Sequence, residues 1–478
     1  MVFNSLPFLA FLPAVVVIYF ILRSRWQWQN IVLLVASYVS YGFWDQRFLA
    51  LVAGMTVINY AAGWAIGRPS SNASNSSRRK RAYLVLAIAF DLCVLGAFKY
   101  FNFFDDSLVH LLSLFGVHID PVSLKIILPL GLSFYTFQAI TYPFDIYRGK
   151  IAPTRRFLDF ALFVSFFPTV VSGPIERASH LLPQFSGPRD VTSDKVNEGL
   201  WLIMWGFFQK MVIADNIGLI VNQVYGNYTQ YHGLDIVIAV LAYTVQILAD
   251  FGGYTDIARG VARLFGFDLL LNFNVPYFAI NPSDFWSRWH ISLSSWFRDY
   301  VYVPLGGNRK GGWRTSLNLL VTMVLCGLWH GAAWTFVIWG AWHGLLLVVY
   351  RLSGKAAQSV DRTIKDWRSV ISIGGRTALM VVLVAAGWAV FRATSFSQVA
   401  YLFSHLGFSH SDATLNLLLR LFCFTLPLVI VQIFQWRTAS PVFTTRLNAW
   451  ARGVAYGCIV VGIIVSQREI THFIYQGF

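Results

Sequence analysis

Two histidines, His290 and His330, have the residue type and the setting that best suit catalysis in this chain. His290 lies in a polar, basic and tryptophan-rich segment from residue 284 to 314, and His330 ends the apolar run that follows. Ionisable side chains at membrane depth are costly, so they usually mark function. A neutral imidazole suits general-base work near neutral pH, and the small residues of CGLWHGAAW leave space beside His330. On the residues alone, a histidine that only bridges helices explains His330 equally well.

The other polar residues nearby have plainer alternatives. Arg288 and Arg298 could hold phosphate or carboxylate groups, but FWSRWHISLSSWFRD equally predicts an amphipathic helix anchored at the membrane surface by its tryptophans. His343 is expected to bridge helices. Cys326, one helical turn before His330, is expected to be an inert core thiol. The chain has no metal-site spacing, nucleophile elbow or phosphate loop, so any chemistry would come from the membrane helices themselves.

Composition places these residues in a membrane. Of 478 residues, 56% are hydrophobic and only 12% are charged, which is about half the charged share of a soluble domain. Because a spanning helix needs about 20 apolar residues, we expect an all-α polytopic protein with about 11–13 membrane helices, some of them re-entrant or broken. The net charge of +15 comes from short loops between apolar runs, which indicates topology rather than nucleic-acid binding.

Apolar runs define the expected helices. Spans are predicted at residues 6–22, 31–43, 48–66, 83–98, 122–140, 200–214, 234–248, 317–330, 333–350, 378–391, 421–434 and 453–465. Residues 157–171 are too few to cross comfortably, which predicts a re-entrant helix. Two aspartates and two glycines between residues 250 and 256 predict a broken helix that lines a polar cavity.

Loop charges and segment order give the expected organisation. Basic loops at residues 23–28, 67–82 and 145–156 alternate with weakly charged ones, which places these loops in the cytoplasm and the N-terminus outside. We expect a single membrane-embedded domain. Its parts are N-terminal helices over 1–156, a catalytic core over 157–350 and C-terminal helices over 351–478.

Several longer stretches together resemble a known family. They include ILPLGLSFYTFQAI, DFGGYTDIA, NFNVPYF, FWSRWHISLSSWFRDYVYVPLGGNR and LWHGAAWTFVIWGAWHG, and they spread from residue 1 to about residue 350. The chain resembles the membrane-bound O-acyltransferases, in the bacterial branch that modifies polysaccharides. The resemblance implies a ring of helices around a thin centre with a tunnel, located in the bacterial inner membrane. It also implies that His330 is the catalytic histidine and His290 the second motif histidine.

The resemblance further implies transfer of an acetyl group from a cytoplasmic thioester, acetyl-CoA or an acyl-carrier protein, with no bound cofactor. The final acceptor would be an exopolysaccharide such as alginate or cellulose, reached through a periplasmic esterase-like partner, with membrane lipid around the helices. Donor-binding or tunnel-lining residues are expected at Arg288, Trp289, Arg298, Asp299, Asn274 and Trp329.

Two roles for the histidines remain open. His330 would deprotonate the acceptor hydroxyl while His290 polarises the carbonyl or positions the donor, or an acyl-histidine would form. Transfer of D-alanyl or another acyl group, and a transporter with broken helices, are the alternative functions. The transporter is disfavoured because no internal repeat is apparent in the sequence.

Overall fold

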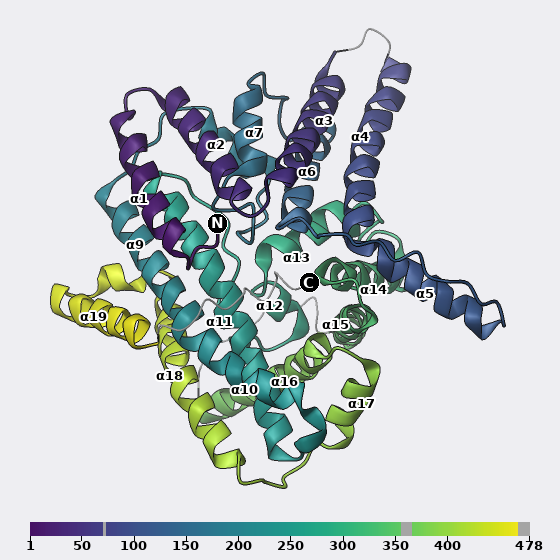
Figure 1. Cartoon of the computed structure of the whole chain (residues 1–478), viewed down its shortest axis with the longest axis vertical. Coiled ribbons are helices and arrows are strands. Elements are labelled where there is room, and N and C mark those ends of the chain that lie inside the picture. Colours follow the sequence, from purple (N-terminus) through teal and green to yellow (C-terminus); the bar gives the residue numbers. More distant parts are fainter. Residues whose placement is uncertain (70–72, 355–365, 467–478) are drawn as a thin grey trace. The chain divides into compact units, whose positions relative to one another are not determined.

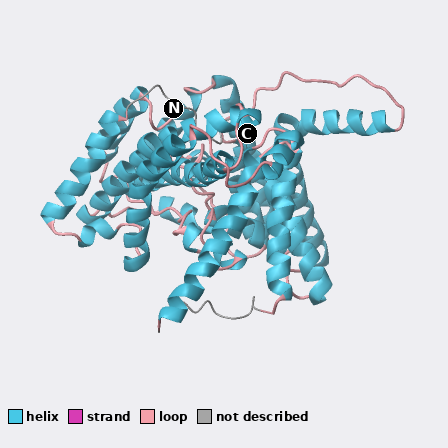
Figure 2. Ribbon diagram, turned by 90° about the horizontal axis from the view of Figure 1, so that it is seen from below, coloured by secondary structure: helices cyan, strands magenta, loops and turns pink. Residues whose placement is uncertain are grey.

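The computed structural model describes residues 1–69, 73–354 and 366–466. Within these ranges the secondary structure is helical and contains no β-strand (Figure 2). Six of the described helices are long and apolar enough to cross a membrane, and Leu6–Ile21 and Ala449–Val465 are shorter apolar helices. The expected class, an all-α polytopic membrane protein, is confirmed. The chain divides into two compact units, one of residues 1–203 and 257–270 and one of residues 204–256 and 271–478.

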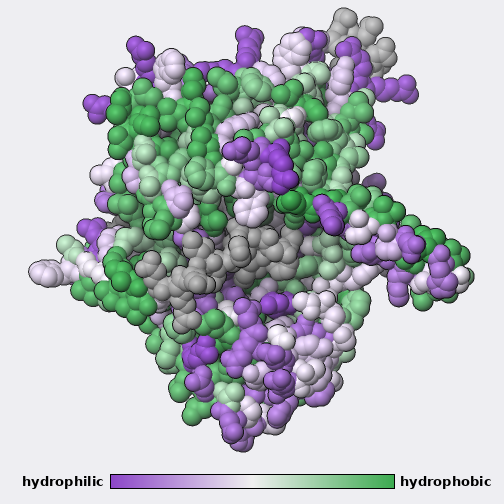
Figure 3. Space-filling model, in the orientation of Figure 1, coloured by the Kyte–Doolittle hydropathy of each residue, from purple (hydrophilic) through white to green (hydrophobic). Residues whose placement is uncertain are grey.

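The first unit is built from the N-terminal helices (Figure 1). They are α1 (Leu6–Ile21), α2 (Trp26–Gly42), α3 (Leu49–Gly67), α4 (Ala73–Leu95), α5 (Phe101–Leu114), α6 (Leu132–Tyr147), α7 (Phe157–Ser165) and α8 (Ala178–Leu181). Many outward side chains of α1 to α4 are apolar, and Leu6, Ile21 and Leu86 are strongly exposed. Figure 3 shows this hydrophobic surface, with hydrophilic side chains at its upper edge. Exposed apolar helices with polar ends are typical of contact with lipid.

Paired polar side chains tie these helices together inside the first unit. Asn59 of α3 donates to both carboxylate oxygens of Asp91 of α4 at 3.0 Å, and both residues are buried. Arg189 donates to the Tyr19 hydroxyl at 2.8 Å and to the Asn30 side chain at 2.7 Å. Polar groups away from water need such partners, so these contacts fix how the helices pack.

The predicted span at 122–140 is wrong. Residues 115–131 contain no helix, and α6 begins at Leu132. Pro129 lacks a backbone donor, and Gly131 has φ +73°, a left-handed conformation that a helix cannot continue through. The loop instead returns from the end of α5, which projects at the right of Figure 2. The short helix α7, which ends at Ser165, agrees with the expected non-spanning segment.

The basic loop predicted at 67–82 is also largely helical. Residues 78–81 lie within the first part of α4, while residues 70–72 lie outside the described residues. Arginine and lysine are good helix formers, so a run of them does not end a helix.

The second unit contains most of the remaining helices. They are α10 (Asp215–Gly226), α12 (Pro282–Trp286), α13 (Ile291–Phe297), α14 (Gly311–His330), α15 (Trp334–Leu352), α16 (Trp367–Arg392), α17 (Phe396–Ser404), α18 (Thr414–Thr438) and α19 (Ala449–Val465). Two helices, α9 (Ser193–Phe207) and α11 (Leu234–Leu264), contribute residues to both units. The five helices predicted between residues 317 and 465 are present, each longer than predicted.

Helix α11 is continuous where a broken helix was expected. A Cβ atom on Gly253 would lie 2.7 Å from the carbonyl oxygen of Gly206 and 3.2 Å from the backbone nitrogen of Lys210. The glycine therefore lets α11 pack closely against the π-helical turn Phe208–Ala214. Lys210 Nζ lies 2.8 Å from carboxylate oxygens of both Asp215 and Asp250. The Asp250 carboxylate is thus paired inside the protein instead of lining an open cavity.

Candidate functional site

His290 occupies the buried turn that enters α13. Its backbone has φ 42° and ψ 53°, and the other non-glycine residues with positive φ in the described ranges are Val275 and Ala439. A left-handed conformation costs a non-glycine residue about 1–2 kcal/mol, so it persists only where surrounding contacts impose it. Such strained positions cluster at functional sites.

Asn272 supplies the contacts that impose this turn. Its backbone oxygen accepts a hydrogen bond from Ile291 N–H at 2.9 Å. Its side-chain Oδ1 lies 2.6 Å from Ser292 Oγ, 3.2 Å from Ser292 N and 3.2 Å from His290 Nδ1. All three side chains are buried. Asn274, two residues later, is the predicted site residue, because nothing in the sequence relates Asn272 to a histidine 18 residues away.

His330 is the last residue of α14, and its ring lies among aromatic side chains. Ring centroids of Trp329 and Trp339 are each 5.0 Å away, and that of Phe391 is 5.4 Å away, all in edge-to-face geometry. His330 is 2% exposed. Residues 387–393 (GWAVFRA), at the end of α16, therefore contribute to the surroundings of this histidine through Phe391.

The structure brings His290 and His330 together. Their ring centroids are 6.3 Å apart, and Trp329 packs against both rings, at 5.9 Å from His290. This separation is too long for a direct hydrogen bond between the two imidazoles. The two imidazoles and Trp329 therefore form one buried cluster.

Arg288 is engaged in holding the backbone. Its Nε donates to Asp284 Oδ1 at 2.7 Å, and its Nη1 donates to the backbone oxygen of Asn274 at 3.1 Å. The side chain of Asn274 is exposed and takes no part in these contacts. Trp289 is completely buried against Phe273 and Trp388. These three predicted donor-binding residues thus contact neighbouring protein.

The amphipathic surface helix considered for this segment is wrong. The tryptophans that would have anchored it, Trp286, Trp289 and Trp296, are buried. The segment consists of the two short helices α12 and α13 and a π-helical turn, Arg298–Tyr302. The elements of this segment contact other helices of the same unit, among them α14 and α15.

Arg298 lines a cavity of about 420 Å³ between this segment and α14. The residues that line it include the hydroxyl-bearing Ser283, Ser287, Ser294, Ser295, Thr322 and Tyr302 and apolar residues such as Cys326. Arg298 Nε lies 2.9 Å from Asp299 Oδ1, and this hydrogen bond raises the pKa of Arg298. Arg298 and Asp299 are therefore a partly exposed ion pair at a cavity of mixed polarity.

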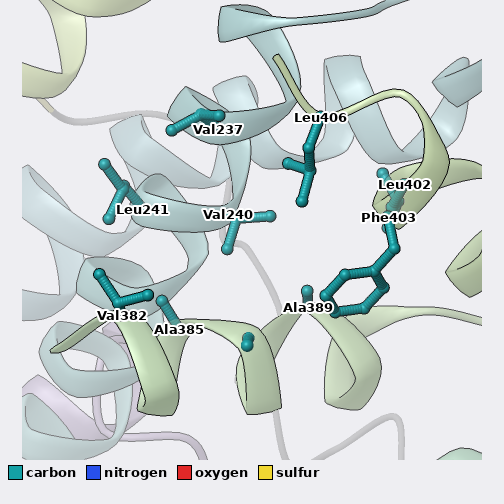
Figure 4. A pocket seen from close by; sticks show the side chains of 10 residues that line it. Val237, Val240, Leu241, Val382, Ala385, Ala389, Leu402, Phe403 and Leu406 are labelled. Atoms are coloured by element: carbon teal, nitrogen blue, oxygen red, sulfur yellow. The ribbon is translucent and has the colours of Figure 1, made fainter. Parts of the chain in front are cut away.

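A second cavity has a different character. It measures about 230 Å³ and lies between α11, α16 and α17 (Figure 4). The side chains in Figure 4 are all apolar, so this cavity offers no group for proton transfer. In the described residues, no cluster of three or more histidine, cysteine, aspartate or glutamate side chains could hold a metal ion.

His343 lies on α15, a different helix from His330, as expected. It stacks on Phe285 at 5.8 Å and contacts Trp339 at 4.9 Å. Trp339 therefore touches both His330 and His343. The structure places His343 beside the aromatic surroundings of the pair, not between the two rings.

Comparison with known proteins identifies the family of this chain. Residues 33–391 match the model of the membrane-bound O-acyltransferase family. A probable alginate O-acetylase AlgI of Azotobacter vinelandii is 42% identical over 87% of this chain and 80% of its own length. A peptidoglycan O-acetyltransferase of Helicobacter pylori is 35% identical over 76% and 73%, and a teichoic acid D-alanyltransferase of Bacillus subtilis is 31% identical over 47% and 60%. The chain belongs to the membrane-bound O-acyltransferase family and is an O-acyltransferase.

Proposed function

We propose that this protein transfers an acetyl group from a thioester donor towards a hydroxyl group of an exopolysaccharide of the alginate type. The observation that carries the proposal is the convergence of His290 and His330 in one buried aromatic cluster, with ring centroids 6.3 Å apart. The relatives named for O-acetylation of alginate and peptidoglycan supply the substrate class.

The two histidines suit the chemistry of this transfer. A hydroxyl group must lose its proton to attack a thioester, and the departing sulfur must end protonated. Imidazole rings perform both steps near neutral pH. Aromatic side chains pack around both rings, which excludes water and favours transfer over hydrolysis of the thioester.

The donor would arrive beside Arg298. A thioester carrier such as acetyl-CoA or an acyl-carrier protein is anionic, and the positively charged guanidinium lies at a cavity whose lining mixes hydroxyl and apolar groups. We propose that this cavity faces the cytoplasm, and the alternation of basic loops predicts that the N-terminus lies outside. A separate esterase-like protein outside the membrane would then pass the acetyl group to the polymer.

Transfer of D-alanyl is less well supported. The teichoic acid D-alanyltransferase of Bacillus subtilis aligns with 47% of the chain, whereas the alginate relative aligns with 87%. The identity of the acyl group on the modified polymer decides between the two. Mass spectrometry that finds D-alanyl instead of acetyl esters would favour the alternative.

The test is His330→Ala in a strain that carries only this variant. We expect the variant to reach the membrane at the wild-type level and the polymer to lose its acetyl esters. His290→Ala should also cause a severe loss. His110→Ala, which changes an exposed histidine of α5, is the matched control and should leave the acetyl content unchanged. An unchanged acetyl content in the His330→Ala strain would refute the proposal.

A further inference from the structure

Three polar atoms lie within hydrogen-bond distance of Oδ1 of Asn272 at the start of α13. Ser292 N and Ser292 Oγ approach it at 3.2 and 2.6 Å, and His290 Nδ1 approaches it at 3.2 Å. A backbone N–H can only donate, so the atom facing Ser292 N must be the oxygen of the amide and not its nitrogen. The backbone hydrogen bond therefore fixes which way the Asn272 amide points.

This orientation determines the tautomer of His290. The amide oxygen can only accept, so a hydrogen bond to it requires the proton of His290 to be on Nδ1. In a neutral imidazole the other nitrogen, Nε2, then carries a lone pair and has no proton to donate. His290 Nε2 is buried and has no hydrogen-bond partner within the described residues.

The surroundings favour the neutral ring. His290 is fully buried, and its ring packs against Phe251 at 4.7 Å, Trp329 at 5.9 Å and Phe273 at 6.3 Å. Apolar surroundings disfavour a charged imidazolium. The titratable side chain whose ring contacts His290 is His330, at 6.3 Å between centroids.

We propose that Asn272 is a positioning residue for His290, which it holds as the Nδ1–H tautomer so that Nε2 accepts the proton of the attacking hydroxyl group. This inference rests on the proposed acetyl transfer. As the hydroxyl oxygen bonds to the thioester carbon, its proton passes to Nε2. The carbon–sulfur bond then breaks, and the proton passes from Nε2 to the departing sulfur, which leaves as a thiol and returns the ring to its neutral form. A neutral ring of this tautomer cannot polarise the acetyl carbonyl through Nε2, because that role needs a donor.

Two substitutions of Asn272 distinguish a role in orienting His290 from a role in packing alone. Asn272→Leu removes the acceptor oxygen and should lower acetyl transfer about tenfold or more, the scale observed when a metal-binding histidine loses the partner that orients it. Asn272→Asp keeps an acceptor oxygen opposite Nδ1 and should retain more activity. Its rate should reach a maximum at higher pH, because a carboxylate stabilises the imidazolium. Asn227→Leu, the same change at an exposed asparagine of the same unit, should behave like the wild type.

The tautomer itself is measured without any activity assay. Nitrogen-15 NMR of the full-length protein labelled at histidine, with His290→Gln used to assign the signal, should show Nδ1 protonated and Nε2 unprotonated. In Asn272→Leu this preference should be lost. A proton on Nε2 in the wild type would overturn the proposal, as would an Asn272→Leu variant with wild-type activity. If the wild type transferred no acetyl group, the proposed function would fail while the NMR result still tested the tautomer.

Discussion

The contact between α14 and α15 sets the position of His330, so a substitution at this contact tests whether helix packing positions this histidine. These two helices pack side by side within the second unit (Figure 1). At their crossing, a Cβ atom on Gly340 of α15 would overlap the carbonyl oxygen of Met323. It would also lie 3.1 Å from the carbonyl carbon of Met323 and from Cα of Val324. These are backbone atoms, so no side chain can move aside to admit a methyl group. Gly340→Ala must therefore push α14 away from α15.

The size of the effect follows from this geometry. Carbon atoms in contact prefer about 3.5–4.0 Å, so relieving the overlap requires a displacement of about 1 Å. His330 lies on α14, two turns after Met323, and would move with it. A misplacement of about 1 Å can cost about 100-fold in rate, which is about 2.7 kcal/mol in the activation barrier. Overpacking would also destabilise the fold by about 1–3 kcal/mol.

The assay is incorporation of labelled acetate into the extracellular polymer, normalised to the amount of each variant in the membrane. Gly375→Ala is the matched control, because a Cβ atom at this position of α16 would meet nothing within 4 Å. It should keep wild-type activity, and its melting temperature should not fall, since alanine favours the helix. Gly340→Ala with activity within threefold of the wild type would refute the argument that this crossing positions His330.

Two further predictions concern buried charges away from the histidine pair. Lys210→Met removes the cation that contacts both Asp215 and Asp250, which should cost about 3–5 kcal/mol and lower both yield and melting temperature in detergent; an unchanged melting temperature would contradict this. In the first unit, a hydrogen bond at 2.8 Å to buried Glu176 raises the pKa of His180. The resulting stabilisation is complete below the unfolded pKa of about 6.5 and is lost as the pH rises through the higher folded value. His180→Gln should therefore lower the melting temperature more at pH 6 than at pH 8.5, and equal losses at both pH values would contradict the reasoning.

Long apolar runs predicted the helices between residues 317 and 465 because a membrane helix satisfies its backbone internally and needs little else. The same criterion failed over 122–140, where the apolar residues before Pro129 looked like part of a span. Composition does not report that Pro129 and Gly131 block the helix there. The prediction of a broken helix at the paired glycines of α11 is also wrong. The sequence does not distinguish a glycine that breaks a helix from one that allows a neighbouring backbone to approach closely.

The candidate site was predictable in part. The motif histidines and Trp329 lie together in the structure, and their residue types had already suggested chemistry. Asn272 was not selected, because its importance comes from a hydrogen bond across 18 residues of irregular chain. The charge of Arg288 suggests donor binding, yet its Nε and Nη1 already donate to Asp284 and to the backbone of Asn274. Sequence indicates which groups can react, whereas only the fold shows which of them already have partners.

His330 is positioned by the packing of a regular helix, whereas His290 is positioned by hydrogen bonds at an irregular turn. The membrane setting explains this difference. His330 ends a regular helix, so it can be placed by helix packing alone, through glycine contacts such as that of Gly340. Inside a regular membrane helix, the backbone N–H and C=O groups bond to one another. They are therefore not available to orient the second imidazole, that of His290. The left-handed turn at His290 is irregular and buried in protein, where such backbone is tolerated, and it exposes the N–H groups of Ile291 and Ser292 to Asn272. The strained backbone at His290 thus allows Asn272 to orient the imidazole, so that Nε2 carries a lone pair inside the aromatic cluster.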